Sequence, residues 1–241
     1  KQKTAYDVMW LEFRRVLFRS SEEQVNYQSP QPTKQTYDFP TEVISLPSEG
    51  KCYPLTNPLS KGTIEIKYMT AKEEEILASS NLVKKGIVLD KLFESIIVQK
   101  DINPDDIIIG DKNAILMAAR ILAYGPEYSI TIEAEAGEKE EITVDLSKVK
   151  TKDVDLNLLN RENRYNFTTP SGKQITFKLL THGEEKKIDE DIKSLKKINK
   201  DISAELTTRY RYMITGVNGK EDRKAVTDFI NNQFLTRDTR A

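Results

Sequence analysis

Cysteine and histidine are almost absent from this chain, with one of each among 241 residues. The single thiol, Cys52, cannot form a disulfide within the chain, and such sparse cysteine is typical of proteins that fold in a reducing compartment. A structural zinc site needs several cysteine or histidine ligands, so no metal site is predicted. No motif places a nucleophile near His182, so a Ser–His or Cys–His catalytic pair is not predicted either.

Other signatures of chemistry are missing as well. The sequence contains neither a Walker loop nor a Gly-x-Gly-x-x-Gly fingerprint. The acidic runs Glu73–Glu75 and Asp105–Asp106 lack the spacing of a calcium loop, and a helix start and a turn explain them. We therefore predict no enzyme and no cofactor. No apolar run is long enough to span a bilayer, so no membrane partner is expected.

The charge balance excludes a strong electrostatic bias. The formal net charge is −1, and the charged residues, 31% of the chain, mix both signs. Nothing in this composition requires a nucleic-acid partner. The mean hydropathy of −0.56 describes a well-solvated chain that still contains enough aliphatic residues to fold. A chain of this length holds one large domain or two small ones.

One pattern occurs twice, and the second copy begins 111 positions after the first (175 − 64). Ile64–Glu74 and Ile175–Glu185 both read apolar, any residue, apolar, Lys, two apolar residues, Thr, two residues of any type, Glu, Glu. Internal repetition at a fixed register indicates a duplicated module. Two unrelated strand-to-helix units are the alternative, and the shared Lys, Thr and Glu pair favours duplication.

Each copy predicts a strand that runs into a capped helix. The alternation before the threonine is typical of a half-buried strand. In Thr70-x-x-Glu73 and Thr181-x-x-Glu184, a capping box is predicted, in which the hydroxyl accepts from the N3 amide and the Glu side chain reaches back. The acidic side chains also lie near the positive end of the helix dipole. We interpret these four residues as structural helix caps.

The predicted fold class is α+β, a duplicated strand–helices–hairpin module preceded by an extended N-terminal arm. Leu11–Ser20 is similar to the conceptual translation of a common sequencing adapter, so we interpret the start of the chain as an artefact of sequence assembly. The expected segments are an artefact (1–20), a polar, proline-rich arm (21–60), a first module (61–147), a linker (148–162) and a second, incomplete module (163–241).

Within the modules, turn residues set the expected boundaries. Gly125-Pro126 is predicted to stop a helix, and Ala136–Glu138 to join two strands into a hairpin. In the second module, Pro170-Ser171-Gly172 closes a hairpin and Asp222 caps the last helix. The final residues, 236–241, are similar to Gly110–Ala114 of the first module, which indicates that the second copy is cut off within an element.

Six ordered strings carry a resemblance to a known family. They are Leu46-Pro47-Ser48-x-Gly50-x-x-Tyr53, Pro58–Glu74, Gly86–Leu92, Gly110–Ile115, Ala119–Gly125 and Phe177–Glu185. Over roughly Phe39 to Ala241, the chain resembles the baseplate hub subunit and hub-assembly family of T-even-type bacteriophages, which are contractile-tailed myoviruses. The resemblance implies that some relatives have cysteine pairs in hairpins of this kind, which would form a small metal knuckle, whereas Glu133–Gly137 has none.

The resemblance implies a structural subunit of the baseplate hub, the central spike complex, or a factor that assembles it. Its partners would be other tail and hub proteins, in the host cytoplasm during assembly and in the tail baseplate of the virion for a subunit. No catalytic residue is implied, and no oligomeric state is predicted.

A nucleic-acid-associated adaptor is the alternative function, based on the basic face of a helix at Glu184–Lys197. The lysines of this helix alternate with acidic residues, so we expect a solvated surface instead.

Overall fold

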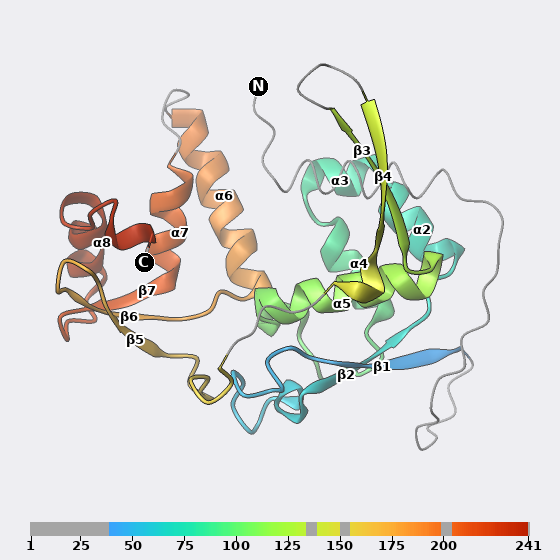
Figure 1. Ribbon diagram of the computed structural model, residues 1–241, viewed down its shortest axis with the longest axis horizontal. Helices are drawn as coiled ribbons and strands as arrows, with labels where there is room; N and C mark the ends of the chain where they lie inside the picture. The colour runs from blue at the N-terminus through green and yellow to red at the C-terminus, as the bar shows by residue number, and fades with distance from the viewer. Residues whose placement is uncertain (1–38, 134–138, 150–154, 199–203, 241) are drawn as a thin grey trace. The chain divides into compact units, whose positions relative to one another are not determined.

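The computed structural model describes residues 39–133, 139–149, 155–198 and 204–240 (Figure 1). It has 47% helix and 21% strand in several small sheets, which confirms the predicted α+β class. The segment interpreted as an artefact, the turn at Ala136–Glu138 and part of the expected linker lie outside the described residues.

The elements of the first half alternate short strands with helices; η denotes a 3-10 helix. In order they are β1 (Thr41–Ser45), η1 (Pro58–Lys61), β2 (Thr63–Lys67), α2 (Ala71–Ala78), α3 (Ser80–Lys85), α4 (Val88–Ile96), η2 (Pro104–Asp106), α5 (Ile109–Tyr124), β3 (Glu127–Glu133), β4 (Lys139–Asp145) and η3 (Leu146–Lys148). The second half contains β5 (Tyr165–Thr168), β6 (Gln174–Phe177), α6 (His182–Ile198), α7 (Glu205–Met213), β7 (Ile214–Val217), α8 (Arg223–Asn232) and η4 (Asp238–Arg240).

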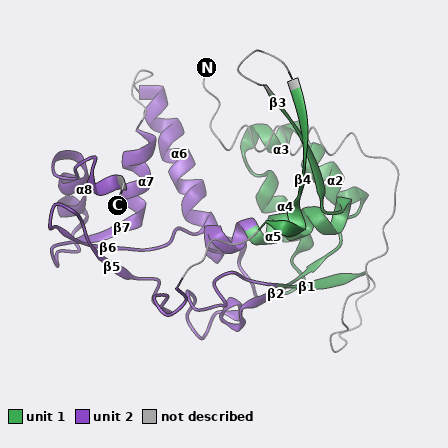
Figure 2. Ribbon diagram, viewed as in Figure 1, with its two compact units in different colours: residues 1–44, 64–99, 114–152 green, residues 45–63, 100–113, 153–241 purple. Residues whose placement is uncertain are grey.

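The chain divides into two compact units, and each is assembled from three separate stretches of sequence (Figure 2). The first unit contains residues 1–44, 64–99 and 114–152, and the second contains residues 45–63, 100–113 and 153–241. The sequence predicted that each module is one continuous stretch of the chain. The compact units instead combine separate stretches, because parts of the first repeat belong to the second unit.

In the first unit, β1 pairs with β2, and the segment after α4 lies along β2 as well. Ile66 forms an antiparallel bridge with Ile97, and the Val98 N–H donates to the Glu65 carbonyl at 3.1 Å. The described part of the expected arm thus contributes a sheet strand, β1. Most of the buried side chains of this unit come from β2, α2, α4 and α5; the fully covered apolar ones are Ile64, Ile66, Leu77, Leu92, Phe93, Ile96 and Ile115.

The first unit also contains the predicted hairpin. Helix α5 ends at Tyr124, and Gly125 follows in a left-handed conformation with φ +81°, which glycine adopts without strain. Strands β3 and β4 then pair antiparallel, with Tyr128 opposite Val144 and Ile130 opposite Ile142. The helix stop and the hairpin strands are confirmed.

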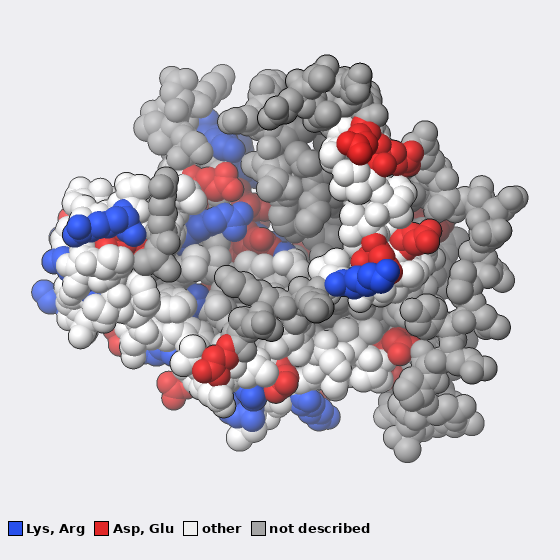
Figure 3. Space-filling view, viewed as in Figure 1, with Lys and Arg blue, Asp and Glu red and all other residues white. Residues whose placement is uncertain are grey.

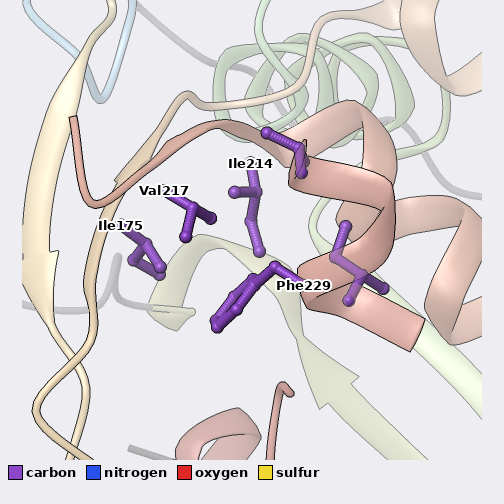
Figure 4. Packing of buried hydrophobic residues seen from close by; sticks show 6 residues of the cluster. Ile175, Ile214, Val217 and Phe229 are labelled. Atoms are coloured by element: carbon purple, nitrogen blue, oxygen red, sulfur yellow. The ribbon is translucent and has the colours of Figure 1, made fainter. Parts of the chain in front are cut away.

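The second unit is built on a three-stranded antiparallel sheet in the order β5-β6-β7. The predicted turn joins β5 to β6: Gly172 donates to the Thr169 carbonyl, and Thr169 donates to the Lys173 carbonyl, both at 2.8 Å. Apolar residues of β6, β7 and α8 form the core of this sheet (Figure 4): Ile175, Ile214, Val217, Val226, Phe229 and Ile230.

A smaller apolar cluster holds helix α6 in the second unit. Leu180, Ile188 and Ile192 are buried there, with Ile109, Tyr212 and Met213 packed against them. Helix α8 begins at the predicted cap, where the Asp222 side chain accepts a hydrogen bond from the Ala225 N–H at 3.1 Å.

Candidate functional sites at the repeated contacts

The junction between β2 and α2 is centred on a buried carboxylate. Glu73 is fully covered, and its oxygens accept hydrogen bonds from Lys67 Nζ at 2.7 Å and Ser95 Oγ at 2.5 Å. They also accept from the Thr70 N–H at 2.8 Å and the Thr70 hydroxyl at 2.7 Å. Burial alone would raise the pKa of Glu73, but these hydrogen bonds lower it to about 2. Glu73 is therefore ionised at neutral pH and acts as a structural anchor.

The junction between β6 and α6 repeats this arrangement. Lys178 Nζ donates to Glu184 Oε1, and the Thr181 N–H donates to Glu184 Oε2 at 3.1 Å. In return, the Glu184 N–H donates to the Thr181 hydroxyl oxygen at 3.3 Å, which completes a reciprocal capping box. The four residues interpreted as helix caps thus lie at the starts of α2 and α6.

The lysine of each junction was visible in the repeat, but its partner was not predicted from the sequence. Lys67 and Lys178 each lie six residues before the glutamate that they contact. Lys67 is the last residue of β2 and Lys178 directly follows β6, so each lies just before the helix whose glutamate it contacts. A shared lysine at this position of both copies was the only signal that could have revealed it.

A second contact fastens a Pro-Ser turn to the start of a helix. Asp111, in the first turn of α5, is fully buried and accepts from the Ser48 N–H at 3.0 Å and the Ser48 hydroxyl at 2.7 Å. The Tyr53 hydroxyl donates to the same carboxylate at 2.6 Å and accepts from the Ile108 N–H at 3.1 Å. Burial and the neighbouring Asp111 charge raise the pKa of Tyr53, so it stays protonated.

The same contact occurs in the second copy, between Ser171 and Asp238. The Ser171 N–H donates to Asp238 Oδ1 at 2.9 Å, and the Ser171 hydroxyl donates to Asp238 Oδ2 at 2.8 Å. Ser48 and Ser171 both follow a proline. We call these two pairs the serine–aspartate contacts. These two contacts give a structural basis for the sequence similarity between residues 236–241 and Gly110–Ala114.

A third correspondence concerns the strand partner that follows α4 in the first copy and α7 in the second. Ile66, just before Lys67, bridges to Ile97, and Phe177, just before Lys178, pairs with Ile214. Each copy therefore contains, in the same order, a Pro-Ser turn, a strand with its lysine, a capped helix, a strand-pairing segment and an aspartate. This shared order of contacts supports duplication of the module.

Helix α6 also anchors a buried ion pair that sequence reasoning missed. Lys112, with 1% of its side chain exposed, donates to Glu185 Oε2. Burial, and then the Glu185 charge, raise the pKa of Asp189 one turn along the helix. Each partner directly follows a residue of a repeated contact, Asp111 or Glu184. No sequence pattern links positions this far apart.

The single cysteine and the single histidine are both buried. Cys52 is buried, with its sulfur 3.5 Å from the Tyr165 hydroxyl, and burial raises the pKa of its thiol. A thiol of raised pKa is a poor nucleophile. His182 is the first residue of α6, where it is buried and its backbone N–H donates to the Ile107 carbonyl at 2.8 Å.

The lysine-bearing face of α6 has mixed charge. Lys187, Lys193 and Lys197 are exposed, and so are Glu190 and Asp191 between them. A patch in which acidic groups alternate with lysines offers weak attraction for a phosphate backbone.

We compared the chain with family models, curated proteins and solved structures, and none of them matched. No helix in the described part of the chain is long and apolar enough to cross a membrane.

Proposed function

We propose that this protein helps to build the baseplate hub of a contractile-tailed bacteriophage, as a hub subunit or a hub-assembly factor. The observation that carries the proposal is the set of six ordered strings that resemble the T-even-type hub family over roughly Phe39 to Ala241. Its action would consist of contacts with other tail and hub proteins.

The positions of the strings support a role in architecture. Asp111, Ile115 and Ala119 lie in two of the strings and are buried along α5. Glu73 and Glu184, from two others, are held in the junctions described above. The strings therefore contain groups that maintain the fold, and a protein that acts through its surface needs such a framework.

The adaptor alternative has less support. It depended on a basic face of the helix at Glu184–Lys197, and exposed acidic residues interrupt that face. In addition, Lys186 is engaged with Asp105 at 2.9 Å. We therefore place hub assembly first.

The decisive experiment is disruption of the gene in a contractile-tailed phage that carries it. Infected cells should accumulate heads without complete tails, and the gene supplied in trans should restore particles visible by electron microscopy. The tagged protein should also bind individual purified hub proteins. Infectious, normally tailed particles from the disrupted phage would refute the proposal. Retention on DNA that falls steeply between 50 and 200 mM salt, with normal tails, would favour the adaptor.

A further inference from the structure

The β3–β4 hairpin carries an apolar face that is only partly covered. The register places Ile130 opposite Ile142, with Ile132 and Val144 on the same face of the pleat. None of these four side chains is buried, and Ile132 is 39% exposed. Figure 1 shows the two strands extending away from helix α5, to which they are joined. An apolar strand face of this kind is usually covered in a folded protein.

The hairpin also has two outer edges. Sheet β3-β4 has two strands, and no described residue forms a third. Two-stranded sheets are marginal in water and gain from another strand. Exposed edges are normally protected by lysine, proline or a bulge. Between Tyr128 and Ile132, strand β3 has no proline and no charged residue, so its outer edge lacks this protection.

The base of the hairpin is held firmly, which keeps this edge in place. Arg120 is buried in α5, and its guanidinium lies 4.7 Å from the ring centroid of Tyr124 and 5.7 Å from that of Tyr128. It also donates to the Gly125 carbonyl at 3.2 Å and the Glu127 carbonyl at 3.4 Å. A preorganised edge loses less entropy when it binds a partner.

The charges of the hairpin favour a basic partner. The face opposite the isoleucines carries Glu127, Glu141 and Asp145, and a hydrogen bond of 3.0 Å joins Ser129 and Thr143 between them. Strands β3 and β4 together contain five acidic residues and one basic residue, Lys139, and Lys148 Nζ lies 3.1 Å from Asp145 beyond the end of β4. Figure 3 shows acidic groups at both ends of this hairpin, with uncharged surface between them and a basic group beside the lower acidic ones. Two copies of such a surface would repel one another, which argues against self-association here.

We propose that the outer edge of β3 binds an extended, amphipathic and basic strand of a partner protein. Main-chain hydrogen bonds would add it about 4.8 Å from β3 as a third strand. Its apolar side chains would continue the face formed by Ile130 and Ile142, and its lysines or arginines would lie on the side of Glu127. This recognition depends on the hairpin alone, so it holds whether or not the partner is a phage tail protein.

The test uses the full chain and a fluorescent seven-residue peptide that alternates valine with lysine, with binding followed by anisotropy. A peptide that alternates valine with glutamate is the matched probe. The valine–lysine peptide should bind more tightly. Glu127→Lys should weaken the binding of the valine–lysine peptide roughly fivefold and strengthen the binding of the valine–glutamate peptide, because the nearest cross-strand charge is reversed. Ile130→Thr should weaken both peptides, since it removes an apolar contact but keeps a β-branched residue.

Controls separate the edge from general effects of charge and folding. Glu75→Lys makes the same charge change at an exposed site on α2 and should leave both affinities unchanged. Circular dichroism checks that each variant is folded, and Glu141→Lys replaces Glu127→Lys if the latter is not. Absent binding, equal binding of the two peptides, or a loss in Glu75→Lys equal to that in Glu127→Lys would overturn the proposal. So would sedimentation showing that the hairpin edge joins two copies of the chain.

Discussion

At the scale of single residues, the buried charge of Glu73 is surrounded by hydrogen-bond partners. Glu73 has no exposed surface, yet four donor groups occupy its two oxygens. Removing one member of such a group is costly because the remaining charge keeps its desolvation penalty without its partner. Glu73 is therefore the residue at which the first junction is most sensitive to substitution.

Glu73→Gln should lower the free energy of unfolding by about 3 kcal/mol. The amide leaves Lys67, only 16% exposed, without its carboxylate, and it cannot accept all of the existing hydrogen bonds. Urea denaturation monitored by circular dichroism measures the change. Glu75→Gln, at an exposed position of the same helix, is the matched control and should change stability by less than about 0.5 kcal/mol. Equal effects of the two variants would contradict the role given to Glu73.

The same carboxylate should make stability depend on pH in acid. Its pKa falls from 4.5 to about 2 on folding, so its stabilisation is complete above pH 4.5 and is lost as the pH falls through about 2. The stability difference between wild type and Glu73→Gln should therefore shrink by about 3 kcal/mol across this window. Urea midpoints of both proteins at several pH values test this. A difference that is constant from pH 5 to 2.5 would be inconsistent with a depressed pKa.

At the scale of elements, the contacts that the two copies share connect turns to the starts of helices. The capping boxes are local, since Thr and Glu lie three positions apart, and their pattern could be predicted from the sequence. The serine–aspartate contacts are not local: 63 positions separate Ser48 from Asp111, and 67 separate Ser171 from Asp238. They became visible only when the fold brought the turn and the helix together.

Ser48→Ala should destabilise the protein by about 2 kcal/mol, because it takes a donor from the fully buried carboxylate of Asp111. Ser171→Ala removes the equivalent hydroxyl but should cost less, since Ser171 is only partly buried whereas Ser48 is buried, so water can replace the lost donor more easily. Thermal or urea unfolding of both variants compares them. A larger loss for Ser171→Ala would show that the two contacts are not equivalent in the way proposed.

At the scale of the whole molecule, the two repeats are not two separately folded pieces. The second compact unit includes residues 45–63 and 100–113 from the first half of the chain. Ile109 donates its N–H to the Leu180 carbonyl at 3.0 Å and packs against the cluster that holds α6. Parts of the first repeat are therefore needed to complete the core around the second.

A fragment of residues 155–241 should be less stable than the second unit in the full chain, by roughly 3 kcal/mol or more from lost apolar burial. Circular dichroism should show less helix and a lower urea midpoint, because α6 loses both Ile109 and the Lys112 partner of Glu185. A fragment of residues 100–241 retains both and is the matched control. Identical midpoints for the shorter fragment and the full chain would refute this dependence.

The local features of this protein could be predicted from the sequence alone. Alternation, capping boxes, the stop at Gly125 and the cap at Asp222 depend on residues within a few positions of one another, and they predicted the α+β class and most elements. The folded structure was needed to identify the pairs Lys112–Glu185 and Ser48–Asp111, and the division into two discontinuous units. These features need distant segments to meet, and which segments meet depends on how the whole chain buries its apolar surface and satisfies its buried charges.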